Sequence, residues 1–488
     1  MEWSRGRRVD PALIVVGGAM TVCALVALGW WITDLPLGVD SAVYRAGGFA
    51  VVEGESLYSP LRALPEWAPE LPFTYPPFAA LLFTSLTALP TQLCWGLLAL
   101  AAAPSLYFAL RPFADRAHLP LLLLGAFALQ PVWQTIGLGQ VNLVLMAAVV
   151  TDLVLLRDSR WRGITIGFVA AVKLIPLIFI AHLLVVRRTA DAARALAAFL
   201  GATAFAMVVL PADSVHFWTS AIFNDHFAEM KGWVGNQSWQ GFVARTGQEG
   251  RTATVLIVLC GVAFAAVSMW LVHRLHRAGD DRAAVLVTAG CSLLISPISW
   301  THHWVWVVPA IGFLAARGRR GVALMVAVLF TGWTVAVVPG GGGAERDWNL
   351  AEALIGNAYL ICLLLAGLTR LPRRITLYTP GRRPSFVRVS NVFSPFARIE
   401  QKKRQDARDP SDNADAVGDI GAEGRHDRAG TDDDAEGLPG DDHEAADEER
   451  EEADAGRGQQ NPIHGDHAPG SHSSPTAMRT PNSRVGNR

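Results

Sequence analysis

Apolar runs long enough to cross a lipid bilayer recur along this chain as far as residue 369. Crossing ~30 Å of hydrocarbon takes roughly 17–25 helical residues. Inside hydrocarbon the backbone must satisfy its own hydrogen bonds, which favours helices. The sequence therefore predicts an all-α polytopic membrane protein with about twelve transmembrane helices, at residues 11–33, 76–90, 92–110, 119–133, 140–156, 163–186, 195–211, 252–273, 283–298, 302–316, 321–338 and 351–369.

The distribution of arginine predicts the orientation in a cell membrane. Cytoplasmic loops carry the excess of Lys and Arg. From residue 187 on, this rule predicts that both chain ends are cytoplasmic, together with the basic segments 187–188, 274–282, 317–320 and 370–374. The extracytoplasmic loops would then be residues 34–75, 212–251, 299–301 and 339–350.

The same rule gives no single answer for residues 111–162. Twelve ordinary crossings place the five arginines of this stretch outside, against the rule. Placing them inside requires that 76–110 cross once and that 163–186 enter and leave on one side, which Pro90 and Pro176 would permit. We expect ordinary crossings, because 163–186 has the length of a full span, and the sidedness of 111–162 stays open.

The C-terminal part of the chain has a different composition. Residues 401–488 contain no Phe, Trp or Tyr, and hold about twice as many acidic as basic side chains. Such a segment cannot bury enough apolar surface to offset its ordering entropy. We therefore expect a membrane domain at 1–375 and a disordered, acidic, cytoplasmic tail at 376–488.

Asp40 opens a short amphipathic segment after the first span. Apolar residues recur from Val39 at helical spacing, which predicts a helix lying on the membrane surface with Asp40 in its first turn. A carboxylate is favoured there by the helix dipole, so Asp40 could simply cap the helix. Alternatively, it is a general base held at the membrane surface.

The segment Ser296–Trp306 places two adjacent histidines at the mouth of an apolar run. Ionisable residues at the edge of a span are costly, so His302 and His303 are candidate functional residues. Trp300 and its neighbouring tryptophans are typical of an interfacial aromatic belt. The alternative is that both histidines are helix-end residues bonded to backbone carbonyls. Adjacent histidines on a helix point about 100° apart, so we predict no metal site here.

Other polar residues interrupt the apolar runs. Tyr75 precedes a helix start and could be a belt aromatic. Gln140 and Asn142 could cap a helix or bind a sugar. Lys173 lies inside an expected span, where it must snorkel, pair with an acid or face a water-filled cavity.

The long loop 212–251 carries amides, tryptophans and an arginine. Amides hydrogen-bond hydroxyls, and Arg clamps phosphate oxygens, which suits Asn236, Gln237 and Arg245 to carbohydrate and phosphate. An ordinary solvated loop is the alternative. The sequence contains no phosphate loop, dinucleotide-binding fingerprint or cysteine-pair motif, and we predict no cofactor.

These polar motifs, in this order, resemble the polyprenol-phosphate-mannose-dependent α-(1→2)-mannosyltransferases of actinobacteria. The resemblance covers about residues 11–370 and rests on Asp40, Phe73–Phe78, Gly139–Asn142, Val172–Pro176, Gly235–Ser238 and Ser296–Trp304. Those enzymes are membrane proteins of the glycosyltransferase C superfamily. They extend phosphatidylinositol mannosides, lipomannan and lipoarabinomannan of the cell envelope. The acidic tail departs from the family pattern.

The resemblance implies an extracytoplasmic site and an inverting single displacement. The donor would be polyprenol-phosphate-mannose, and the acceptor a mannosylated lipid or lipoglycan. The implied base is Asp40, and His302 or His303 would contact the donor phosphate. The implied substrate-binding residues are Tyr44, Tyr75, Gln140, Asn142, Lys173, Asn236, Gln237, Arg245 and Trp300.

Two other functions fit the same sequence. A glycosyltransferase using a different polyprenol-phosphate sugar, such as arabinose or glucose, is not excluded by these motifs. A lipid or sugar transporter would also explain many spans and Lys173. It predicts paired repeats and an acidic partner for Lys173, and the sequence shows no internal repeat.

Overall fold

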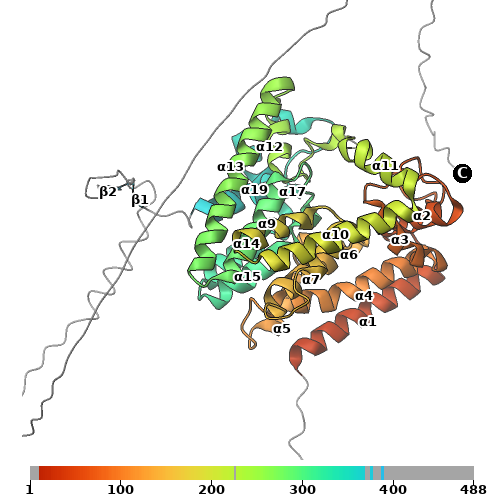
Figure 1. Cartoon of the computed structure of the whole chain (residues 1–488), viewed down its shortest axis with the longest axis horizontal. Coiled ribbons are helices and arrows are strands. Elements are labelled where there is room, and N and C mark those ends of the chain that lie inside the picture. The colour runs from red at the N-terminus through yellow and green to blue at the C-terminus, as the bar shows by residue number, and fades with distance from the viewer. Residues whose placement is uncertain (1–9, 225–226, 369–373, 377–385, 389–488) are drawn as a thin grey trace, which may run out of the picture. The chain divides into compact units, whose positions relative to one another are not determined.

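We describe the protein from a computed structural model, for residues 10–224, 227–368, 374–376 and 386–388 (Figure 1). The chain divides into two units, 1–392 and 393–488, and all described residues lie in the first. The tail expected at 376–488 therefore lies outside the described residues, apart from 376 and 386–388.

The membrane domain is built from helices. The first half contains α1 (Pro11–Ile32), α2 (Val39–Glu53), α3 (Pro77–Phe83), η1 (Thr84–Ala88), α4 (Thr91–Leu110), α5 (Leu119–Ala126), α6 (Gln130–Leu138), α7 (Asn142–Val150), η2 (Thr151–Leu155), α8 (Ile164–Val172), η3 (Ile175–Leu177), α9 (Ile178–Val185) and α10 (Thr189–Val209). The second half contains α11 (Pro211–Thr219), η4 (Ala221–Phe223), η5 (Ala228–Met230), α12 (Trp239–Arg245), α13 (Gly250–Arg277), α14 (Asp281–Ile295), η6 (Thr301–Trp306), α15 (Val307–Ala316), α16 (Arg320–Leu329), α17 (Trp333–Ala336), η7 (Ala344–Asp347), α18 (Leu350–Gly356) and α19 (Ala358–Leu368).

Among the described residues, four helices are long and apolar enough to cross a membrane: α1, α4, α10 and α13. The number rises to six if the bent pairs α5–α6 and α18–α19 each count as one span. The prediction of a helical membrane protein is confirmed. Several expected spans are shorter than predicted, because prolines and glycines break the apolar runs into separate helices.

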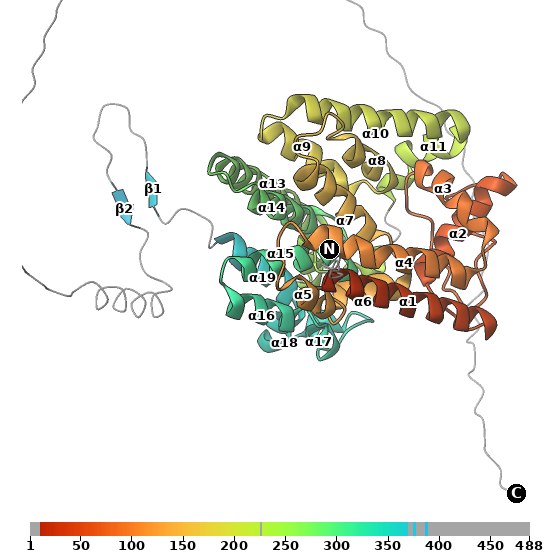
Figure 2. The same ribbon diagram turned by 90° about the horizontal axis from the view of Figure 1, so that it is seen from below.

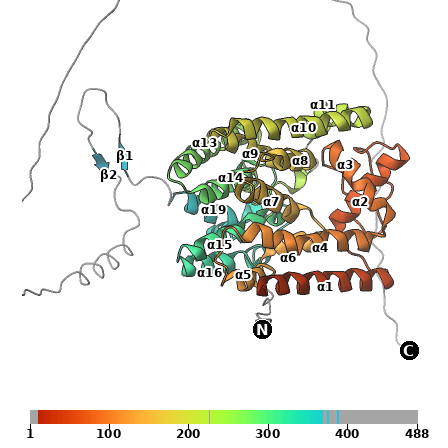
Figure 3. The ribbon, with the colours of Figure 1, turned by 60° about the horizontal axis from the view of Figure 1, so that its bottom comes forward.

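Three long helices, α1, α4 and α10, run in a similar direction, and short helices gather at one end of them. In Figures 2 and 3, α1, α4 and α10 run lengthwise, and α2, α3 and α11 gather at one end of them. The chain enters α1 from the opposite end. Asp10 caps α1 by accepting from the Ala12 amide, and Pro11 occupies the first turn, where no amide donor is needed.

Polar contacts join loops at that opposite end. Arg162 lies 3.6 Å from Asp191, and the Arg194 side chain donates to the Arg162 carbonyl. His118 lies 3.5 Å from Arg320. The two ends of the stretch 163–186, expected to span the membrane fully, therefore lie next to each other. This arrangement matches the alternative in which 163–186 enters and leaves on one side.

Breaks in three helices position side chains inside the bundle. Lys173 follows α8 in an extended conformation (φ −147°, ψ 126°), and Pro176 prevents α8 from continuing. Ser296 ends α14 in an extended conformation because Pro297 follows it. Gly139 ends α6 with φ 70°, and a Cβ there would lie 2.7 Å from Ser41. Glycine thus allows the α6–α7 turn to approach α2.

Among the described residues, a pair of short strands departs from the all-α prediction. β1 (Arg374–Thr376) pairs antiparallel with β2 (Phe386–Arg388), with Ile375 opposite Val387. Alternating and β-branched residues in these segments favour extended backbone.

Candidate active site

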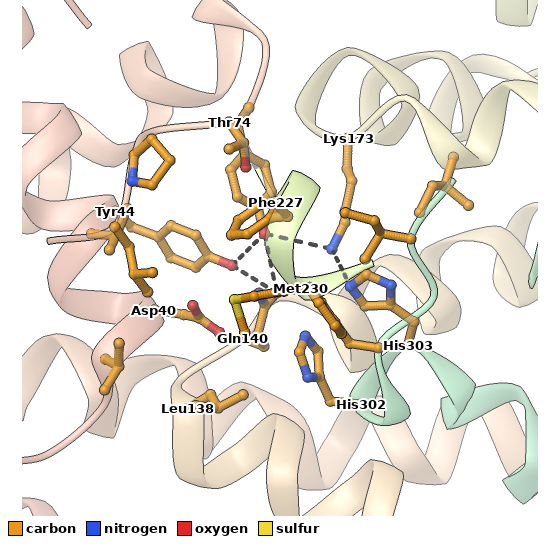
Figure 4. A pocket seen from close by; sticks show the side chains of 18 of the residues that line it. Asp40, Tyr44, Thr74, Leu138, Gln140, Lys173, Phe227, Met230, His302 and His303 are labelled. Atoms are coloured by element: carbon orange, nitrogen blue, oxygen red, sulfur yellow. Dashed lines mark hydrogen bonds between the residues drawn. The ribbon is translucent and has the colours of Figure 1, made fainter. Parts of the chain in front are cut away.

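The helix breaks surround a cavity of about 440 Å³. Its walls come from the start of α2, the segment before α3, the α6–α7 turn, the break after α8, and η6 with the residues before it. Figure 4 shows Asp40 and Tyr44 on one side, and Lys173 and His303 on the other. Of the sequence-predicted site residues, the cavity brings together Asp40, Tyr44, Tyr75, Gln140, Lys173, Trp300, His302 and His303.

Asp40 lies in the first turn of α2, as the sequence predicts. The N-cap of α2 is Gly38, and Asp40 makes no capping hydrogen bond. Burial raises the pKa of Asp40 from its ordinary 3.8 to about 6, although the Gln140 amide and the charge of Lys173 act to lower it. A carboxylate with this pKa is ionised at neutral pH and is a stronger base than an ordinary aspartate.

A chain of hydrogen bonds connects Lys173 to Asp40. The Lys173 ammonium lies 3.5 Å from the Tyr75 hydroxyl, which lies 2.7 Å from the Tyr44 hydroxyl. Tyr44 donates to Gln140 Oε1 at 2.7 Å (Figure 4). With Oε1 accepting from tyrosine, the amide group of Gln140 donates to the Asp40 carboxylate. Each donor in this chain therefore points toward Asp40.

Lys173 supplies a cation in the opposite wall. It donates to Asn142 Oδ1 at 2.9 Å and lies 5.4 Å from the centre of the Tyr75 ring. Among the described residues no carboxylate forms an ion pair with it. A cation held in an apolar protein without an acidic partner is suited to binding an anion that enters the cavity.

The two histidines lie beside Lys173 rather than at a simple helix end. His303 Nε2 is 3.5 Å from the Lys173 ammonium, and the two imidazole rings are 4.6 Å apart. The buried Nδ1 atoms of His302 and His303 have no partner among the described residues. Within the same residues, no three His, Cys, Asp or Glu side chains form a group that could hold a metal ion.

Asn142 lies behind the cavity, at the start of α7. Its oxygen accepts from Lys173, and its amide donates to the His302 carbonyl at 3.1 Å. Thr135 donates to the same carbonyl at 3.0 Å. Asn142 therefore links Lys173 to the histidine segment rather than facing the cavity.

Asn236, Gln237 and Arg245 are not brought to the cavity. Each is at least 95% buried. Asn236 Oδ1 accepts a hydrogen bond from the backbone N–H of Ser299 at 3.0 Å. The backbone N–H of Gln237 donates to the Ser299 carbonyl at 2.8 Å. These residues hold the backbone just before His302. Their positions do not support the direct substrate binding expected from the sequence.

Arg245 makes its bonds within the protein. It donates to Asn357 Oδ1 and to the carbonyl oxygens of Trp233 and Asn236. We expect Arg245→Met to lower the free energy of unfolding by about 1–3 kcal/mol, because buried acceptors lose their donor. Thermal denaturation in detergent micelles measures this loss.

The matched control is Arg346→Met, which removes an exposed guanidinium paired with Glu249 and should leave stability nearly unchanged. The residue would instead belong to the substrate site if Arg245→Met kept full stability and weakened substrate binding.

Several cavity residues are absent from the sequence prediction. They are Thr74, Gln134, Leu138, Phe227, Met230, Trp233 and Thr301. Gln134 is a half-buried residue of α6 that lines the cavity and accepts a hydrogen bond from Thr301. Phe227, Met230 and Trp233 come from a loop in which apolar residues recur at neither helical nor strand spacing, so the sequence pattern does not point to them.

Comparison with known proteins places this site in a family context. A sequence model of glycosyltransferase family 87 matches residues 73–297. The chain is 32% identical over 389 residues to a polyprenol-phosphate-mannose-dependent alpha-(1-2)-phosphatidylinositol mannoside mannosyltransferase of Mycobacterium tuberculosis, covering 70% of this chain and 88% of that protein. It is 33% identical over 357 residues to a polyprenol-phosphate-mannose-dependent alpha-(1-2)-phosphatidylinositol pentamannoside mannosyltransferase of the same species, covering 67% and 79%.

A third relative comes from Mycolicibacterium smegmatis. This alpha-(1-2)-phosphatidylinositol pentamannoside mannosyltransferase is 30% identical over 388 residues, covering 74% of this chain and 90% of that protein. No solved structure matches the chain.

Proposed function

The chain belongs to glycosyltransferase family 87, and from this premise we propose that it transfers mannose from polyprenol-phosphate-mannose to a mannosylated phosphatidylinositol lipid. The names of the relatives supply the donor and the class of acceptor. The observation that carries the proposal is the placing of Asp40 and Lys173 in opposite walls of one cavity. Glycosyl transfer requires a base for the acceptor and a positive charge for the leaving phosphate.

The reaction is a single displacement at the anomeric carbon of mannose. Asp40 takes the proton of the acceptor 2-hydroxyl while its oxygen bonds to that carbon. The bond from the carbon to the phosphate oxygen breaks, and polyprenyl phosphate leaves with the electron pair. A β-linked donor, as the family resemblance implies, gives the α-(1→2) product by inversion.

Lys173 is the group placed to stabilise the leaving phosphate. Its charge has no acidic partner among the described residues, and the His302 and His303 rings lie beside it. Negative charge on the phosphate grows as the bond breaks, so a fixed cation stabilises the transition state more than the ground state. We assign the donor phosphate to this wall and the acceptor hydroxyl to the Asp40 wall.

The tyrosine chain orients the base. Tyr44 and Tyr75 fix the oxygen side of the Gln140 amide, which leaves its donor side to the Asp40 carboxylate. One Asp40 oxygen is thereby held, and the other is open to the acceptor. Trp300 offers an aromatic face in the same cavity for a sugar ring.

We propose that this site opens to the extracytoplasmic side of the cell membrane and that both chain termini are cytoplasmic. The contacts of Arg162 with Asp191 and of His118 with Arg320 support about ten crossings instead of twelve, with 163–186 entering and leaving on the cytoplasmic side. Every basic loop then obeys the positive-inside rule. Lys173, at the turn of 163–186, lies within the bilayer depth.

Transfer of radiolabelled sugar from polyprenol phosphate to lipid acceptors in membranes tests the function. We expect transfer from the mannose donor and little from the arabinose or glucose donor. Transfer from one of those donors instead would establish the alternative glycosyltransferase. Movement of intact lipid or sugar across a vesicle membrane, without bond formation, would establish the transporter.

The pKa of Asp40 predicts the acid limb of the pH profile. Because the base must be ionised, kcat/KM should fall as pH drops below about 6, by tenfold per pH unit well below that value. Initial rates at substrate concentrations well below KM measure the profile. Gln140→Leu removes a hydrogen bond that lowers the pKa of Asp40, so its acid limb should move to higher pH. A flat rate through this range would show that Asp40 is not the base.

A further inference from the structure

A second cavity of about 370 Å³ adjoins the first. The two cavities share four wall residues: Thr74, Leu174, Phe227 and Ile298. Figure 4 shows Thr74 and Phe227 in the space between Tyr44 and Lys173. The second cavity therefore lies on the far side of these four side chains from the first.

One part of the second cavity is aromatic. The Tyr58 ring lies 5.6 Å from the Phe217 ring and 6.3 Å from the Phe73 ring. Phe73 and Phe217 are buried, whereas Phe223 is 78% exposed at the edge of the cavity. The half-buried Tyr58 ring and the exposed Phe223 ring, backed by Phe73 and Phe217, offer apolar faces that suit the C–H face of a sugar.

Polar side chains complete the lining, namely Thr74, Asn224, Lys231 and Gln240. Gln240, in the first turn of α12, and Thr74 both line the cavity. Among the described residues, neither the Gln240 amide nor the Thr74 hydroxyl has a hydrogen-bond partner. An amide and a hydroxyl that remain available beside aromatic rings provide both donors and acceptors for sugar hydroxyls.

We propose that the second cavity binds a sugar of the acceptor that neighbours the mannose being extended, so that acceptors with at least two mannose residues bind more tightly. This inference rests on the proposed function. The donor carries a single sugar, which must lie beside Asp40 and Lys173 in the first cavity. A second cavity with a sugar-binding lining therefore serves the partner that carries further sugars.

The chemistry of the lining argues against the polyprenyl chain as the occupant. An isoprenoid chain covering Gln240 and Thr74 would remove these groups from water without replacing their hydrogen bonds. A sugar replaces those bonds. The lining thus favours a sugar over the donor lipid.

Transfer kinetics with two acceptors test the inference. Phosphatidylinositol carrying one mannose and phosphatidylinositol carrying several are compared in the wild type and in Gln240→Leu. We expect KM for the larger acceptor to rise about 3- to 10-fold, because one hydrogen bond is lost. KM for the one-mannose acceptor and for the donor should not change. Phe223→Ala, at an exposed position, should give the same pattern.

Gln248→Leu is the matched control, because it is the same substitution at an exposed position outside both cavities. Equal changes for both acceptors, or no change for either, would overturn the inference. A change in the donor KM alone would assign the cavity to the polyprenyl chain.

Binding without turnover separates this inference from the proposed function. Calorimetry compares a soluble mannobioside with mannose on the purified protein. Tighter binding of the mannobioside, weakened in Gln240→Leu, supports the second sugar site even if the wild type transfers no mannose. Equal binding of the two sugars contradicts it even if transfer is normal.

Discussion

Asp40→Asn is expected to lower the turnover of mannose transfer by roughly 10²- to 10⁴-fold. Asparagine has nearly the same size, and α2 does not depend on Asp40 for its cap. The amide cannot accept the proton of the acceptor hydroxyl, so the chemical step is lost while donor binding at the Lys173 wall remains. Single-turnover transfer in membranes measures the rate, and a donor-binding assay provides the comparison.

The same substitution should stabilise the folded protein at neutral pH. Burial raises the pKa of Asp40, so its ionised form is less favourable in the folded than in the unfolded chain. The resulting loss of stability is absent where both states are protonated, grows as pH rises from about 4 to about 6, and is complete above that range. Asp40→Asn removes it, a gain of about 3 kcal/mol at most.

Thermal denaturation across this pH range checks the sign of this change in stability. The difference between Asp40→Asn and the wild type should be largest at neutral pH, shrink as pH falls toward 4 and disappear below the ordinary pKa of 3.8. A variant that is inactive because it unfolds would show the opposite sign. Full transfer activity in a stable Asp40→Asn protein would remove Asp40 from the reaction.

Lys173→Met is expected to lower kcat by about 10²- to 10³-fold, because the leaving phosphate loses its fixed cation. Methionine keeps the apolar stem of the side chain. Donor KM should rise less than kcat falls, since charge on the phosphate grows as the bond breaks. Steady-state kinetics with purified enzyme separate the two effects.

A pH profile gives this variant a second readout. The charge of Lys173 lowers the pKa of Asp40, so its removal should move the acid limb of activity to higher pH. Lys173→Arg keeps the charge and should keep the limb in place, although its fork-shaped group fits the Asn142 contact less well. Our assignment fails if Lys173→Met and the wild type share both rate and pH profile.

The sequence predicts which polar residues gather around one cavity better than it predicts the bounds of the spans. The helix starting at Val39 is confirmed, because apolar residues at helical spacing depend only on local geometry. Eight of the predicted site residues line one cavity, as ionisable and amide groups in an apolar chain gather where water can reach them. The sequence favours a full crossing at 163–186, and although Pro176 permits a broken helix there, run length alone does not decide between the two.

The sequence does not predict that polar side chains of the 212–251 loop are buried. The side chains of Asn236, Gln237 and Arg245 could bind a sugar or a phosphate. In the folded protein they form hydrogen bonds with neighbouring backbone groups instead. The competition between a ligand and a carbonyl oxygen depends on tertiary contacts such as that of Gln237 with Gly356. Neither composition nor spacing contains that information.

The close approach of Gly139 to Ser41 means that some parts of the cavity lining are held more firmly than others. It fastens the α6–α7 turn to α2, and the Trp95 indole reinforces the joint by donating to the Ile136 carbonyl at 2.6 Å. Asp40, on α2, and Gln140, in the α6–α7 turn, are thus held on two segments that are joined to each other. Phe227 and Met230, elsewhere in the cavity lining, lie at the single 3₁₀ turn η5. We expect adjustment to the shape of an acceptor there, so substitutions at these two positions can alter acceptor choice without touching the base.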